Sequence, residues 1–128
     1  MNNKEYMDGV LLTESIDLET IRGRMTDENL RLLHVGKGLA TEAGEFIDML
    51  KKHIFYGKEL DKVNLIEELG DLYWYINVAQ DVLGVTTEDV QERNNAKLMK
   101  RYKGKCFTEE AANNRDLDIE RKALEGDR

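Results

Sequence analysis

Three observations predict that this chain is all-α. It contains no proline, and 35% of its residues are charged; proline interrupts helices, and charged side chains solvate the outer faces of packed helices. Apolar residues recur every three or four positions over two long segments, which is the period of a helix with one buried stripe. No segment has a competing strand pattern. We therefore expect a four-helix-bundle-like fold with an extra C-terminal helical segment.

The first two expected helices run from about Asn3 to Glu14 and from about Glu28 to Ile54. The buried stripe of the second helix is predicted to consist of Leu32, Val35, Leu39, Ala43, Phe46 and Leu50. Three glycines interrupt this helix, and each costs up to ~1 kcal/mol relative to alanine. Either close packing against another helix explains them, or Gly38 leaves room for a ligand.

The third expected helix, from about Asp61 to Leu83, is apolar around much of its circumference, which is typical of a central helix. Gly84 should end it in the left-handed conformation. A fourth helix follows to about Tyr102. A last one, from Thr108 to about Leu124, is strongly charged and should pack outside the bundle or on a neighbouring subunit.

Length and composition narrow the class of protein. A chain of 128 residues suits a single domain, here with a catalytic core at about 28–102 and a helical extension at about 105–125. The net charge of −7 argues against general nucleic-acid binding. The sequence contains no run of ~20 apolar residues, which a membrane-spanning helix would need, and no N-terminal signal pattern. The lone Cys106 fits a reducing compartment, so we expect a cytoplasmic protein.

Two pairs of acids stand out because they lie in the two most apolar helices. Glu42 and Glu45 are three residues apart, and Glu68 and Asp71 repeat that spacing. Residues at i and i+3 share a helix face, so each pair can present two carboxylates in one direction. Isolated acids at such positions are ordinarily solvated. Two pairs at corresponding places on adjacent helices favour a site.

Four converging carboxylates require compensation. Two like charges ~4 Å apart repel by ~4 kcal/mol at an effective dielectric of 20, so the group needs protons or a cation. Hard oxygen ligands suit Mg2+, with Mn2+ as a substitute, and such ions bind substrate phosphates while keeping several waters. The residues therefore predict a metal site.

A basic segment supplies the complementary charge. Asn94, Lys97 and Arg101 fall at i, i+3 and i+7 of the fourth helix, and one amide with two cations suits the oxygens of a polyphosphate. A solvated basic face is the other interpretation. His34, two turns before Glu42, is a candidate to contact a nucleotide base, although a buried, hydrogen-bonded histidine is equally compatible with its position.

These motifs resemble those of the MazG-like all-α nucleoside triphosphate pyrophosphohydrolases. The signature helices of that family are similar to the runs 38–45 (Gly-Leu-Ala-Thr-Glu-Ala-Gly-Glu) and 67–72 (Glu-Glu-Leu-Gly-Asp-Leu), and its basic helix is similar to the Asn95-x-Lys97-x-x-x-Arg101 stretch. The resemblance implies Mg2+-dependent hydrolysis of NTPs or dNTPs to the monophosphate and pyrophosphate. It also implies homodimers or homotetramers whose subunits complete each other's sites.

Carried over by position, the resemblance makes Glu42, Glu45, Glu68 and Asp71 the metal ligands and catalytic carboxylates, with Lys97 and Arg101 on the phosphates. Either Glu42 or Glu45 would orient or deprotonate the attacking water. The alternative is a non-catalytic helical module that binds nucleotides or a protein partner. Base and sugar preference, metal number and biological role are left open by these residues.

Overall fold

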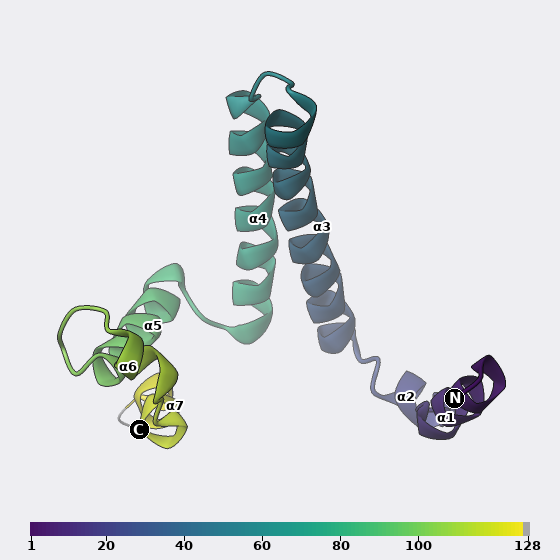
Figure 1. The fold of residues 1–128 in the computed structure, drawn as a ribbon. Coiled ribbons are helices and arrows are strands. Elements are labelled where there is room, and N and C mark those ends of the chain that lie inside the picture. The colour runs from purple at the N-terminus through teal and green to yellow at the C-terminus, as the bar shows by residue number, and fades with distance from the viewer. Residues whose placement is uncertain (127–128) are drawn as a thin grey trace.

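A computed structural model describes residues 1–126 of the chain, as seven helices (Figure 1). They are α1 (Asn3–Thr13), α2 (Leu18–Gly23), α3 (Asp27–Tyr56), α4 (Lys62–Leu83), α5 (Thr87–Arg101), α6 (Glu109–Asn113) and α7 (Leu117–Glu125). No strand occurs in this part of the chain, which confirms the predicted all-α fold.

Local sequence accounts for where the helices begin and end. Every helix follows an Asn, Asp or Thr whose side chain accepts a hydrogen bond from a backbone N–H of the first turn, which satisfies a donor that the helix leaves free. These caps are Asn2, Asp17, Thr26, Asp61, Thr86, Thr108 and Asp116. Gly57 and Gly84 end α3 and α4 at φ 66° and 64°, in the left-handed region that glycine favours.

The two longest helices, α3 and α4, pack along each other as an antiparallel hairpin (Figure 1). The predicted stripe of α3 faces this contact: Val35 is buried and its other members are half-buried. Gly38 is also buried, and a Cβ added there would collide with the ring of Tyr75 on α4. Close helix packing therefore explains Gly38, and the alternative of space kept for a ligand against it is wrong.

The C-terminal part differs from the prediction in one respect. The single helix expected from Thr108 to about Leu124 is divided into α6 and α7, because the chain leaves the helical conformation at Asn114 and is capped again at Asp116. The helix α7 packs against α5, as expected for a segment outside the bundle, and this unit stands apart from the hairpin (Figure 1).

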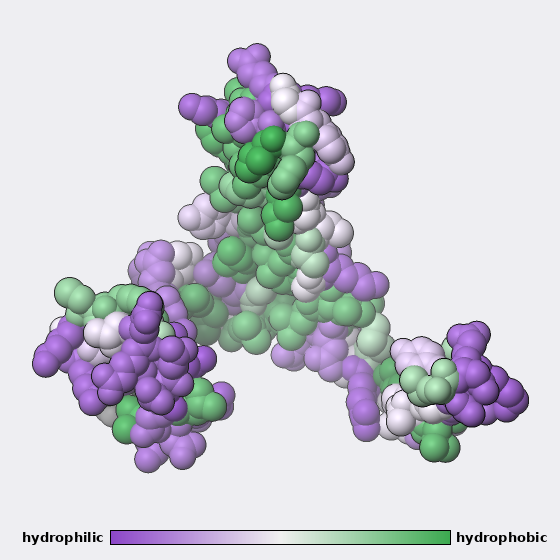
Figure 2. All heavy atoms as spheres, viewed as in Figure 1, coloured by the Kyte–Doolittle hydropathy of each residue, from purple (hydrophilic) through white to green (hydrophobic). Residues whose placement is uncertain are grey.

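Much apolar surface lies uncovered on the single chain. Val35, at 5% exposure, is the one buried hydrophobic residue among the described residues, whereas Ile66 and Trp74 of α4 are 69% and 56% exposed. Figure 2 shows apolar residues gathered along the hairpin. The prediction that α4 is central is therefore met only on the side that faces α3. None of the helices in residues 1–126 combines the length and apolarity that a bilayer crossing requires.

Candidate metal centre

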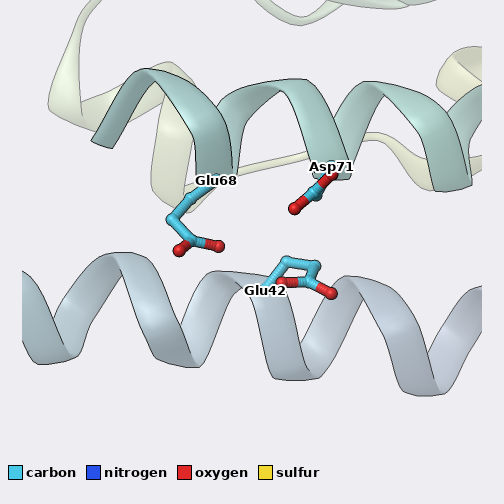
Figure 3. Close-up of side chains that lie close together, drawn as sticks. All are labelled: Glu42, Glu68 and Asp71. Carbon is cyan, nitrogen blue, oxygen red and sulfur yellow. The ribbon is translucent and has the colours of Figure 1, made fainter. Parts of the chain in front are cut away.

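Three of the four predicted carboxylates meet between the hairpin helices. Glu42 projects from α3, and Glu68 and Asp71 project from α4 (Figure 3). Each offers one oxygen, and these oxygens all lie within 4.8 Å of one another. The i,i+3 spacing places Glu68 and Asp71 on one face, and the antiparallel packing of α3 brings Glu42 opposite them.

Glu68 is the least solvated member of the group, at 4% exposure. Its Oε1 accepts a hydrogen bond of 3.3 Å from the Nδ2 of Asn64, while its buried Oε2 has no hydrogen-bond partner. Burial raises the pKa of Glu68, and the charge of Glu45 raises it further, as do Glu42 and Asp71. A buried carboxylate oxygen without a partner calls for a proton or a cation.

Asn64 had not been predicted as part of the site. It lies one helical turn before Glu68, so the i,i+4 spacing was the available signal. Its amide can donate to Glu68 and orient that carboxylate, as partners of metal ligands commonly do.

Glu45 lies outside the group whose oxygens converge. Its side chain is exposed on α3, one turn along from Glu42, yet its charge still contributes to the raised pKa of Glu68. This carboxylate is therefore near enough to influence the group electrostatically without being one of the converging carboxylates.

One to two turns away from the carboxylates, the hairpin carries an aromatic cluster. His34 stands edge-on to Tyr75 and Trp74, with ring centroids 5.6 and 6.4 Å away. It lines a surface hollow together with Leu30, Arg31, Leu33 and Lys37. Arg31 in turn donates to Asp81 of α4 at 2.6 Å. The predicted base contact therefore lies on an exposed aromatic and basic surface of the same hairpin.

The structure does not bring the basic face of α5 to the carboxylates within one chain, because α5 packs on α7. Asn94 is exposed and Lys97 half-buried. Arg101 donates through Nε and Nη2 to Glu120 of α7, at 2.9 and 2.8 Å. The sequence analysis does not identify Glu120, because no local spacing links it to Arg101, nineteen residues away. It does not identify the second partner, Arg115, either, because that residue is five positions from Glu120 and lies before α7 begins.

An all-α hairpin with a buried, incompletely satisfied carboxylate group has the donor set of a site for a hard divalent cation. The MazG nucleotide pyrophosphohydrolase domain matches residues 31–107, more than half of the chain, and the chain therefore belongs to that family. The match covers nearly all of the hairpin and all of α5, and ends before α6. Comparisons with curated proteins and with solved structures gave no significant match.

Proposed function

We propose that this protein is a Mg2+-dependent pyrophosphohydrolase that cleaves nucleoside triphosphates, NTPs or dNTPs, to the monophosphate and pyrophosphate. The observation that carries the proposal is the buried Oε2 of Glu68, which has no hydrogen-bond partner, in a carboxylate that converges with those of Glu42 and Asp71. Such a group fits Mg2+, with Mn2+ as a substitute, because hard cations prefer oxygen ligands. The family of the chain supports the reaction class.

Within this proposal, Glu42, Glu68 and Asp71 hold the cation. When bound, it supplies positive charge that neutralises phosphate oxygens and acidifies water. Asn64 keeps Glu68 oriented through its hydrogen bond. Glu45, the fourth carboxylate, remains free to accept a proton from the attacking water, since it lies outside the converging group. The residues thus divide into three ligands and one base.

The phosphates require cations that the hairpin of one chain does not supply at the carboxylates. We assign this role to Lys97 and Arg101 of α5, with the amide of Asn94 as a further hydrogen-bond donor, provided by a second copy or by movement of α5 about the residues 85–86 that join it to α4. Negative charge developing on the leaving pyrophosphate would be offset by such groups.

A homodimer or homotetramer accounts for the uncovered apolar surface. Contiguous exposed apolar patches usually mark protein interfaces, and α4 exposes Ile66, Leu69, Tyr73 and Trp74. Two hairpins packed through these faces would form a core of four helices. His34 and its aromatic neighbours lie beside that face, where a nucleotide base would be enclosed by the second subunit.

The first test is pyrophosphate release from a panel of NTPs and dNTPs, with Mg2+, with Mn2+ and with chelator. Release should require the cation and be lost in the Glu68→Ala, Asp71→Ala double variant. Glu67→Gln is the matched control, because this exposed acid is adjacent in sequence and outside the group. Binding of nucleotides without release of pyrophosphate would instead indicate a nucleotide-binding module.

A further inference from the structure

The most completely paired charge in the described residues lies away from the carboxylate group. Glu120 of α7 is 3% exposed and is held by two arginines. Arg101 of α5 donates to it at 2.9 and 2.8 Å, and Arg115 at 3.1 and 2.6 Å. Each guanidinium makes a two-pronged contact with the same carboxylate, the strongest form of this interaction.

This arrangement holds one guanidinium more than the carboxylate needs. Hydrogen bonds from Arg101, then from Arg115, hold the pKa of Glu120 far below its usual range. The hydrogen bonds to Glu120 raise the pKa of Arg115, while burial and the charge of Arg101 act against that rise, because the two cations repel each other. If Arg101 moved away, Glu120 would keep its two hydrogen bonds from Arg115, so its buried charge would still be paired.

The surroundings of Arg101 favour an anion. The hollow beside the contact between Arg101 and Glu120 has three cations against two acids in its lining, which consists of Lys100, Arg101, Lys103, Asn114, Asp116, Ile119 and Glu120. Lys103 has φ 52°, the one positive φ at a non-glycine position in the part of the chain described here. That conformation is unfavourable for a side chain with a Cβ, and it occurs in the turn that leads out of α5.

We propose that Glu120 and Arg115 form a resting position for Arg101, and that an oligophosphate competes with Glu120 for this arginine. The proposal rests on the proposed function, because it concerns one of the phosphate-binding residues assigned there. In the resting state the ion pair with Glu120 keeps Arg101 from binding phosphate. When a triphosphate is bound, Arg101 exchanges one oxyanion for another while Arg115 stays on Glu120. The C-terminal extension thereby sets how readily the phosphate-binding residue is released.

The test is a double-mutant cycle on the binding of inorganic tripolyphosphate, measured by calorimetry in chelator. Glu120→Gln should tighten binding by roughly 5-fold or more, the lower end of ordinary coupling between sites. The same substitution in an Arg101→Gln background should have less than about a 2-fold effect, because the withheld group is gone. Glu125→Gln is the control, since Glu125 pairs with Arg121 on the exposed side of α7.

Equal tightening by Glu120→Gln in both backgrounds would show a simple charge effect and overturn the proposal, as would no tightening at all. If circular dichroism shows that Glu120→Gln is unfolded, an NMR titration of the 15N-labelled wild type with tripolyphosphate tests the proposal instead. Tripolyphosphate should then shift the Nε–H signal of Arg101 and leave that of Arg115 in place; the opposite pattern, or no shift, refutes the exchange. Neither measurement needs hydrolysis, so a protein that binds as expected but releases no pyrophosphate would refute only the proposed function.

Discussion

Replacing Gly38 by alanine should both destabilise the hairpin and weaken cation binding at the proposed metal site. The added Cβ would collide with the Tyr75 ring, which itself packs edge-on against Trp74 at 4.9 Å and His34 at 5.6 Å. Overpacking of this kind costs about 1–3 kcal/mol. Replacing glycine by alanine in a helix stabilises the folded state by up to ~1 kcal/mol, because glycine loses more backbone freedom on folding.

Two glycines on the same helix separate these opposing effects. A Cβ added at Gly36 or Gly44 meets nothing within 4 Å in the chain. Gly36→Ala and Gly44→Ala should therefore only stabilise the protein, through the higher helix propensity of alanine. Relative to them, Gly38→Ala should be less stable by about 1–3 kcal/mol. Urea unfolding followed by circular dichroism, at one protein concentration and in chelator, measures the difference.

The metal site should respond because Gly38 lies one turn from Glu42, and Tyr75 one turn from Asp71. Forcing the helices apart at this contact separates oxygens that lie within 4.8 Å. The stabilisation that Mg2+ adds should therefore be smaller in Gly38→Ala than in the two controls. The reasoning is refuted if Gly38→Ala matches the controls in both stability and Mg2+ response. A loss of stability in Gly36→Ala or Gly44→Ala would instead place a second subunit against that part of α3.

Three further predictions concern the site and its assembly. The raised pKa of Glu68 means that the folded protein binds the proton of this carboxyl more tightly than the unfolded protein does. The tighter binding adds to the free energy of unfolding below pH 4.5, and this contribution is lost as the pH rises through the pKa of the folded state. In chelator, wild type should therefore lose stability relative to Glu68→Gln as the pH is raised from about 4 to 7, and Mg2+ should reverse the order; parallel pH curves in chelator would contradict this. Lys97→Ala should raise the Michaelis constant or slow turnover, without altering the circular dichroism spectrum, if the lysine binds phosphate; unchanged kinetics would remove it from the site. Ile66→Lys places a charge on the exposed face of α4 and should dissociate the proposed oligomer in analytical ultracentrifugation; a monomeric wild type would refute the proposed assembly, and an oligomeric mass left unchanged by the substitution would put the interface elsewhere.

The local features of this protein could be predicted because they depend on residues close in sequence. Helix starts follow from capping side chains such as Thr26 and Asp61, and Gly84 ends α4 because it tolerates a left-handed φ. The pairing of Glu68 with Asp71 on one face follows from the helical period alone. The buried stripe of α3 was found by the same reasoning.

Other features required the packing of elements far apart in the chain. Helical spacing does not say that Glu45 would stay outside the group while Glu42 meets Glu68, because that depends on the rotation of α3 against α4. Nor does it say that Gly38 would receive the ring of Tyr75. The capture of Arg101 by Glu120 lies furthest from prediction, since both are ordinary charged residues until α7 is laid across α5.

The amino-acid sequence alone determined the all-α fold, the helix boundaries of the hairpin and the faces that carry its acids, because hydrogen bonding and side-chain period act over a few residues. The tertiary structure decided which of those acids converge and which arginine pairs with Glu120. Burial and charge pairing depend on distances across space, and these distances exist only once the helices have packed.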